Sequence, residues 1–102
     1  MHPTIAQHRE PIAEVCRRYG IRRLDVFGSS TTDAFDERTS DVDVAVDFDD
    51  VTSADYFDRF FAVKEELERI VGRRVDLLTW SSIRNPYFRQ RVEATSENLY
   101  AA

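Results

Sequence analysis

Residues 42–48, VDVAVDF, alternate strictly between apolar and acidic or small side chains, and this segment constrains the fold more than any other. A period of two predicts a β-strand whose two faces meet different surroundings. The apolar face comprises Val42, Val44, Val46 and Phe48. The opposite face carries Asp41, Asp43, Ala45 and Asp47. The sequence therefore predicts a strand anchored in a core on one side and presenting carboxylates on the other.

The remaining patterns predict helices and two further strands around this segment. Apolar residues at helical spacing indicate helices, and β-branched runs bounded by turn residues indicate strands. We expect helices at 4–19, from 52 or 53 to 71, and from 85 nearly to the C-terminus, and strands at 21–27, 42–48 and 74–79. The predicted fold class is α/β (α+β), with one layer of helices against a small mixed sheet of three or more strands.

Length and charge limit the remaining possibilities. At 102 residues the chain can bury about 65% of its unfolded surface, so we expect one domain over 1–102. With 42% hydrophobic residues and only three glycines and three prolines, the chain does not resemble collagen or disordered segments. A net charge of −5 argues against direct nucleic-acid binding, which needs basic surface. No signal peptide or membrane span is expected, and Cys16 is the one cysteine, so we predict a cytoplasmic protein.

Three aspartates form the candidate catalytic site. Asp41 and Asp43 are two residues apart on one strand, so both side chains point to the same face. Asp76 interrupts the apolar run of the strand at 74–79, where a core residue would be expected. If the two strands are neighbours, the three carboxylates converge, and such a cluster suits Mg²⁺ bound together with substrate phosphates. Three unrelated surface aspartates are the alternative interpretation, because a D-x-D spacing is common in acidic chains and by itself supports little.

Gly28 and Ser29 form the second part of the candidate site. They end the strand at 21–27, where glycine allows a sharp turn and a close approach of backbone to ligand. Serine offers a hydroxyl and an N–H to a phosphate oxygen, and a helix starting there would favour the same anion. An ordinary turn is the alternative for this pair by itself.

Phe27-Gly28-Ser29 followed, eleven residues later, by Asp41-Val42-Asp43 resembles the signature of the DNA polymerase β-like nucleotidyltransferases. The chain is most similar to minimal nucleotidyltransferases, the MNT or MntA-type antitoxins paired with HEPN-domain toxins. The likeness extends through Gly72-Arg73-Arg74, the run at 75–78, and 84–88, RNPYF.

This resemblance implies residue roles and a reaction. Asp41, Asp43 and Asp76 correspond to the catalytic, metal-binding carboxylates, which would hold two Mg²⁺ ions. The turn of Gly28 and Ser29, with Ser30 beside them, corresponds to the triphosphate site for ATP. The implied function is that of an antitoxin that transfers AMP to a tyrosine of its partner, a HEPN ribonuclease toxin, and so inactivates it.

The sequence departs from that family at one place. Many relatives carry Arg-Gly shortly after the Gly-Ser pair, whereas this chain has Thr32 and Asp33. Arg38, Arg73 and Arg74 are candidates to supply the missing positive charge. The departure keeps two alternatives open: an antitoxin that acts by binding alone, and a nucleotidyltransferase for a small molecule such as an aminoglycoside.

Aromatic residues crowd the helix that ends near residue 71. Phe57, Phe60 and Phe61 fit a core-facing stripe, continued by Leu67 and Ile70 or Val71, whereas Tyr56 lies off it and is a candidate partner contact. A hetero-oligomer with the toxin is expected, through a surface that the sequence does not identify.

Overall fold

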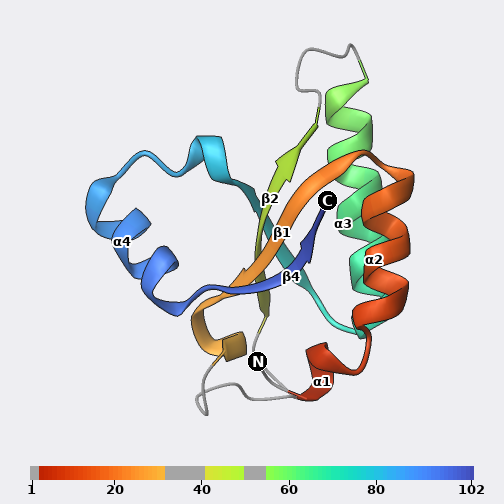
Figure 1. Cartoon of the computed structure of the whole chain (residues 1–102), viewed down its shortest axis with the longest axis horizontal. Helices are drawn as coiled ribbons and strands as arrows, with labels where there is room; N and C mark the ends of the chain where they lie inside the picture. Colours follow the sequence, from red (N-terminus) through yellow and green to blue (C-terminus); the bar gives the residue numbers. More distant parts are fainter. Residues whose placement is uncertain (1–2, 32–40, 50–54) are drawn as a thin grey trace.

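The computed structural model describes residues 3–31, 41–49 and 55–102, which form one sheet with helices on both sides (Figure 1). The helices are α1 (Pro3–Ala6), α2 (Arg9–Arg18), α3 (Tyr56–Val71) and α4 (Pro86–Thr95). The strands are β1 (Ile21–Phe27), β2 (Val42–Phe48), β3 (Val75–Thr79) and β4 (Glu97–Ala101). Two short 3₁₀ turns, η1 (Gly28–Thr31) and η2 (Trp80–Ser82), follow β1 and β3. No helix in these described ranges has the length and apolar character needed to cross a bilayer.

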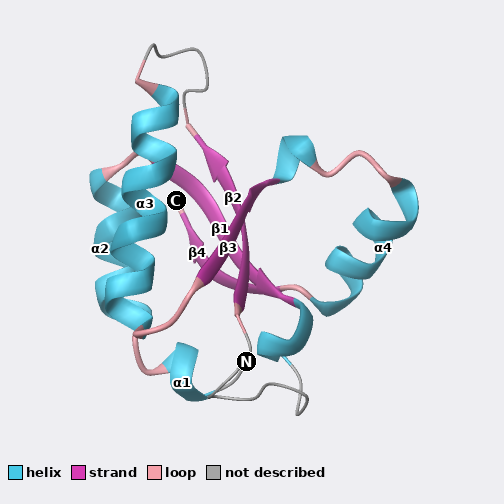
Figure 2. Ribbon diagram, turned by 180° about the vertical axis from the view of Figure 1, so that it is seen from behind, coloured by secondary structure: helices cyan, strands magenta, loops and turns pink. Residues whose placement is uncertain are grey.

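The sheet is mixed, as the sequence predicts, and its strand order is β3-β2-β1-β4. The β1–β2 and β1–β4 pairs are antiparallel, whereas β2 and β3 are parallel. Helix α3 makes the crossover between the two parallel strands, and α2 and α3 lie together on one face of the sheet (Figure 2). The parallel pair brings two acidic strands side by side.

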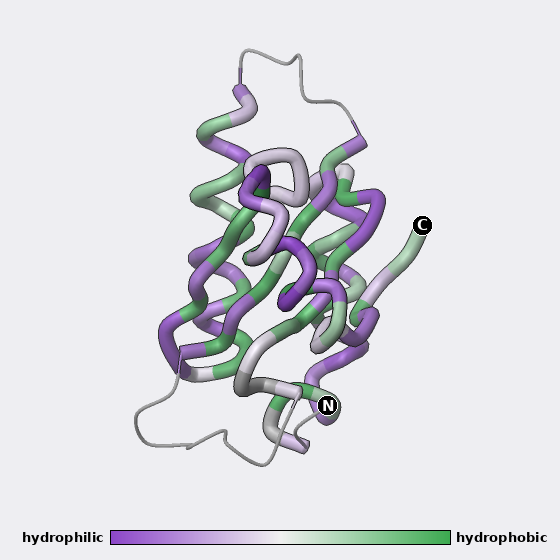
Figure 3. The backbone as a smooth tube through the Cα atoms, turned by 90° about the vertical axis from the view of Figure 1, so that its left-hand side faces the viewer, coloured by the Kyte–Doolittle hydropathy of each residue, from purple (hydrophilic) through white to green (hydrophobic). Residues whose placement is uncertain are grey.

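The alternation along residues 42–48 divides the two faces of the sheet as predicted. Val42, Val44, Val46 and Phe48 are all buried in the main core, against α2 and α3. Asp43 and Asp47, on the other face, are only partly buried. Figure 3 shows the same change between hydrophobic and hydrophilic positions along the strands. One face of β2 is therefore fixed by burial, which leaves the other free to carry polar side chains.

Helix α4 lies on the opposite face from α2 and α3, so the expectation of a single helical layer is wrong (Figure 1). A second, smaller core explains this position: Phe27, Ala45, Trp80, Ile83 and Val92 are buried together there. These side chains project from the face that the aspartates share, because only part of that face is polar. Helix α4 therefore covers part of the sheet face that carries the aspartates.

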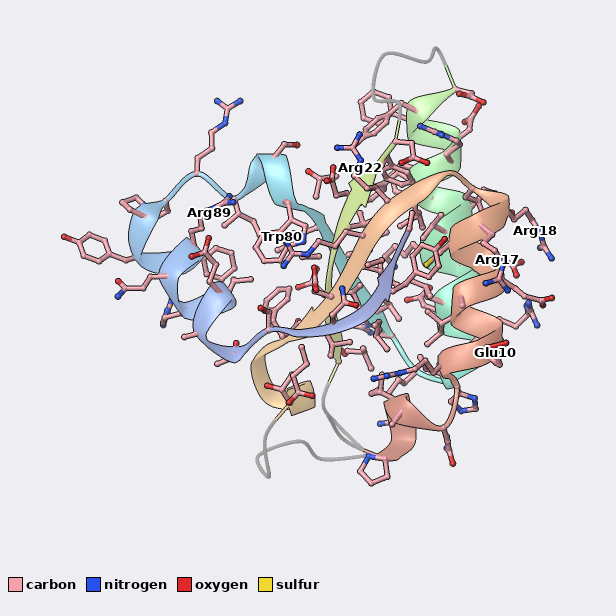
Figure 4. All side chains as sticks on the ribbon, viewed as in Figure 1. Glu10, Arg17, Arg18, Arg22, Trp80 and Arg89 are labelled. Atoms are coloured by element: carbon pink, nitrogen blue, oxygen red, sulfur yellow. The ribbon has the colours of Figure 1, made fainter. Side chains whose placement is uncertain are left out.

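A buried ionic cluster holds this second layer to the sheet. Asp25 is 1% exposed and accepts hydrogen bonds from Trp80 Nε1 at 2.9 Å and Asn98 Nδ2 at 3.1 Å. Arg23 Nε lies 2.7 Å from the same carboxylate. Arg89 donates to the carbonyl of Trp80 at 3.2 Å, and its guanidinium carbon lies 5.5 Å from the centroid of the Trp80 ring. Figure 4 labels both residues. Three donors compensate the buried charge of Asp25. Trp80 contacts both Asp25 of β1 and Arg89 of α4, so the cluster holds α4 against the sheet.

Two predicted helices end differently from expectation. The first is interrupted at residues 7–8, which separate α1 from α2. The last ends at Thr95, and β4 follows it, so the prediction of helix to the C-terminus is wrong. Ser96 is extended (ψ 142°), and Leu99, which falls within the predicted helix, is instead buried from β4. The hydrogen bonds that residues 97–101 form with β1 decide the structure of this segment, although its apolar residues follow a helical spacing.

The buried stripe of α3 is also different from the predicted one. Phe57 is 72% exposed and Phe61 is 56% exposed, so neither belongs to the core. The buried residues of the helix are Val63, Leu67 and Val71, with Tyr56, Phe60 and Ile70 packed against them. A helix beginning at Tyr56 places 56, 60, 63, 67 and 71 on one side, which rotates the aromatic run outward. The predicted caps at residues 52 and 53 lie outside the described residues.

Candidate functional site

The parallel pairing of β2 with β3 places Asp43 directly beside Asp76. Residues in register on neighbouring strands point to the same face of a sheet, so both carboxylates lie on the face opposite the main core. Asp41 comes one residue before β2 and is exposed, as is Asp76, whereas Asp43 is half-buried. The condition that the sequence left open, that the two acidic strands be neighbours, is met.

The three carboxylates influence one another electrostatically. The pKa of Asp43 is raised from 3.8 to about 6, first by burial and then by the negative charges of Asp76 and Asp41. Like charges held near one another disfavour ionisation, and a cation placed among them would remove that cost. This end of the sheet therefore has excess negative charge.

The donor set fits a magnesium ion by chemistry, although it is not a closed metal cage. Among the residues of 3–31, 41–49 and 55–102, no three acidic, histidine or cysteine side chains are arranged so that they could already hold a metal. Mg²⁺ is usually held by one or two carboxylates together with waters and substrate phosphates, so a preassembled cage is not required. Asp41, Asp43 and Asp76 are hard oxygen donors of the type it prefers.

Gly28 turns the chain immediately beside Asp43. Its φ is +67°, and a Cβ built there would lie 2.8 Å from Asp43 Oδ2, a distance that real Cβ atoms essentially never show. Its N–H donates to Thr95 Oγ1 at 3.1 Å, and its carbonyl accepts from Thr31 Oγ1 at 2.9 Å. The glycine is thus required both for the backbone conformation and for space beside the carboxylate.

The rest of the predicted turn is described only in part. Ser29 and Ser30 belong to η1, so their backbone lies next to Gly28, but their side chains are outside the described part of the structure. Thr32, Asp33 and Arg38 also lie outside it. The helix imagined after Ser29 is, over the described residues, a single 3₁₀ turn.

A cavity of about 340 Å³ opens between the glycine turn and α4. Its lining is formed by Phe27, Gly28, Asp43, Phe88, Arg91, Val92 and Thr95. Its lining combines apolar side chains with one carboxylate and one guanidinium, which suits a ligand with a flat apolar part and charged oxygens.

Arg91 is the residue of this cavity that sequence reasoning missed as a site residue. It is exposed, and its guanidinium has no hydrogen bond or ion pair with any described residue. Arg73 and Arg74, the cations named from the sequence, lie in the turn between α3 and β3 and do not line the cavity. The sequence places Arg91 on the predicted last helix, but it does not show which part of the sheet that helix covers. The packing of α4 beside Gly28 shows that Arg91 lines the cavity.

Comparison with known proteins agrees with this geometry. The family model of the nucleotidyltransferase domain matches residues 9–97. Protein adenylyltransferase MntA of Thermococcus cleftensis is 36% identical over 81 residues, covering 79% of this chain and 75% of that protein. The solved structure of a candidate minimal nucleotidyltransferase is 28% identical with a TM-score of 0.75, and the match covers 95% of both chains.

A further likeness concerns fold alone. A chain in the complex of tri-AMPylated Shewanella oneidensis HEPN toxin with MNT antitoxin has a TM-score of 0.65 at 18% identity. The match covers 96% of this chain and 73% of that chain. The four-stranded mixed sheet with helices on both faces is therefore shared with solved minimal nucleotidyltransferases.

Proposed function

This chain belongs to the nucleotidyltransferase domain family, and from that membership we propose that it transfers AMP from ATP to a tyrosine of a HEPN-domain toxin, as its antitoxin. The observation that carries the proposal is the register of Asp43 with Asp76 beside the turn at Gly28. Support comes also from the relative named protein adenylyltransferase, and from the AMPylated toxin in complex with an MNT antitoxin. A reaction that uses ATP and inactivates a ribonuclease would take place in the cytoplasm, and this is the location that we propose for the chain.

The proposed reaction breaks a phosphoanhydride bond of ATP and forms a phosphate ester bond to the acceptor tyrosine. The acceptor oxygen forms a bond to the α-phosphorus, the bond from that phosphorus to the β-phosphate oxygen breaks, and pyrophosphate leaves. The acceptor proton is lost as the new bond forms, and we assign Asp76 to assist its removal because this residue is exposed and lies on β3, the first strand in the sheet order. In this proposal the chain orients ATP and the acceptor tyrosine and compensates the negative charge of the phosphates.

The remaining residues bind and orient the nucleotide in this proposal. Asp41 and Asp43 are assigned to hold Mg²⁺, with a second ion at Asp76, and bound Mg²⁺ supplies neutralisation of the phosphate charge. Gly28 lets the backbone of Ser29 and Ser30 approach the triphosphate closely. Arg91 faces the same cavity and is assigned to contact phosphate oxygens in place of the arginine that this chain lacks after its Gly-Ser pair.

Incubation with ATP, Mg²⁺ and a cognate HEPN-domain toxin tests the proposal. We expect intact-mass measurement to show the toxin gaining one or more AMP groups and losing ribonuclease activity. Omitting Mg²⁺ should abolish both changes. A toxin that is inhibited without any gain in mass would instead support an antitoxin that acts by binding alone, the alternative favoured by Thr32 and Asp33.

Arg91→Ala is expected to weaken ATP binding about 10-fold or more, because a charge-assisted contact to phosphate is lost. The measurement is titration calorimetry with ATP and Mg²⁺. Arg84→Ala is the matched control, since Arg84 is also exposed but does not line the cavity. Equal weakening by the two substitutions would show a general charge effect and would remove Arg91 from the site.

A further inference from the structure

The open edge of the sheet at β3 lies beneath an apolar groove. Among the described strands only β2 pairs with β3, which is the first strand in the sheet order. The groove measures about 290 Å³, and its lining includes Phe57, Phe61, Leu77 and Leu78. Successive side chains of a strand point to opposite faces, so a groove that touches both Leu77 and Leu78 lies over the strand edge itself. We call this feature the edge groove.

The backbone of β3 alternates between facing β2 and facing the edge groove. In a parallel pair, every second residue directs its N–H and C=O to the neighbouring strand. The carbonyl of Arg74 accepts from the N–H of Val42 at 3.0 Å, so Arg74 faces β2. By alternation Asp76 and Leu78 also face β2, and the residues between them face outward.

The first outward backbone group is already covered, and the next two are not paired by a strand. The Glu68 carboxylate of α3 accepts a hydrogen bond from the N–H of Val75 at 3.0 Å. Beyond it, Leu77 and Thr79 direct their N–H groups outward, where the described chain supplies no strand. Both residues line the edge groove. The carbonyl of Thr79 accepts a hydrogen bond from Ser82 Oγ at 2.8 Å, so the outward N–H groups of Leu77 and Thr79 are the groups that an added strand would satisfy.

We propose that the edge groove binds an extended segment of the acceptor protein, which adds as a strand to β3 with apolar side chains at alternate positions. The exposed rings of Phe57 (72%) and Phe61 (56%) form the wall against which those side chains would pack. Large exposed rings that gather beside an open strand edge are typical of interaction surfaces. The identity of the partner rests on the proposed function. The proposed mode of binding, addition of a strand to β3, rests on the geometry of the edge groove.

The same strand connects the edge groove to the candidate active site. Asp76 precedes Leu77, and its side chain points to the face that carries Asp43. A residue of an added strand opposite Asp76 would lie about 4.8 Å from it and point to that face. Strand addition therefore brings an acceptor hydroxyl to the carboxylates, which explains why a binding surface for protein lies on this edge.

A second copy of this chain is a poorer occupant. Pairing of two β3 edges would set two Asp76 side chains on one face at diagonal positions, about 7–8 Å apart. Each already lies in register beside Asp43 of its own chain. Two chains of net charge −5 would add to the repulsion. A neutral or basic segment of another protein avoids both costs.

Phe57→Ala with Phe61→Ala tests the groove wall without disturbing the core, because both rings are exposed. The probe is the same HEPN-domain toxin, titrated by calorimetry. We expect binding to weaken about 30-fold or more, whereas Tyr87→Ala, which removes an equally exposed ring on α4 (79%), leaves it unchanged. Unchanged binding of the Phe variant, or no binding by the wild-type chain, would overturn the inference.

Thr79→Pro tests the strand addition itself. The φ of Thr79 is −88°, close to that of proline, and its N–H faces away from β2, so the sheet keeps its ladder. We expect binding to weaken about 5-fold or more, with little change for Thr79→Ala, which keeps the N–H. Equal binding by the two variants would contradict pairing at this edge.

Toxin mass measured with the wild-type chain separates this inference from the proposed function. Weaker binding of the groove variants without AMP transfer by the wild type keeps the docking surface and rejects the enzyme. AMP transfer by the wild type with full binding of the groove variants keeps the enzyme and rejects the docking surface.

Discussion

Replacing Asp41 and Asp43 together by asparagine is expected to lower AMP transfer by at least about 1,000-fold, because losing the assigned metal ligands removes several kcal/mol of charge stabilisation in the transition state. The measurement is the rate of AMP addition to the toxin by intact mass, at saturating ATP and Mg²⁺. Asparagine keeps the size of each side chain and removes only its charge. A loss of rate can then be assigned to the carboxylates.

The matched control is Asp47→Asn. Asp47 lies on the same strand and the same face as Asp43, but it pairs with Arg22 at 3.8 Å in an exposed ion pair at the other end of β2. Exposed pairs contribute about 0–1 kcal/mol, so neither rate nor stability should change appreciably. If Asp47→Asn lowers the rate as much as the double variant does, general acidity and not the site explains the effect.

The double variant should also be at least as stable as the wild type. In the folded chain the pKa of Asp43 lies above its ordinary value, so ionisation at pH 7 costs folding free energy. Asparagine removes that cost. A midpoint of thermal unfolding that is unchanged or higher therefore accompanies the loss of transfer, and a large drop in that midpoint would mean that the lost activity reports unfolding.

The sequence predicts the carboxylate face well because strand alternation is a local property. The seven residues of VDVAVDF are enough to separate Val44 from Asp43, and their strand forms at the predicted residues. The register that pairs Asp43 with Asp76 is not local, since it depends on how α3 returns the chain to the sheet. From the sequence alone, the three carboxylates converge only on the condition that the two strands are neighbours.

Two wrong predictions, the end of the last helix and the buried stripe of α3, also concern features that depend on tertiary contacts. Val92 and Leu99 continue a helical spacing, but Leu99 belongs to β4 because pairing with β1 satisfies its backbone. Along α3 the aromatic run allows two stripes, and contact with the sheet selects the one through Val63. Tyr56, predicted off the stripe, packs against Phe48 at 5.4 Å between ring centroids. Propensity identifies these elements, whereas tertiary contacts decide their ends and faces.

Gly28→Ala is expected to lower AMP transfer about 100-fold, because the new Cβ would displace the Asp43 carboxylate and a shift of about 1 Å can cost that much. The atom that it meets is the end of a side chain, Asp43 Oδ2, which can rotate away at little cost in folding. The loss of stability should then come from the backbone alone. Alanine at a positive φ costs about 1–2 kcal/mol.

Gly72→Ala separates these two effects. Gly72 has nearly the same conformation, with a φ of +73° against +67°, but a Cβ there would meet nothing within 4 Å. Both variants should lose similar free energy of unfolding in urea, and only Gly28→Ala should lose transfer. Because the backbone strain is matched, the remaining difference in rate measures the position of the Asp43 carboxylate; equal rates in the two variants would show that this position does not matter for the reaction.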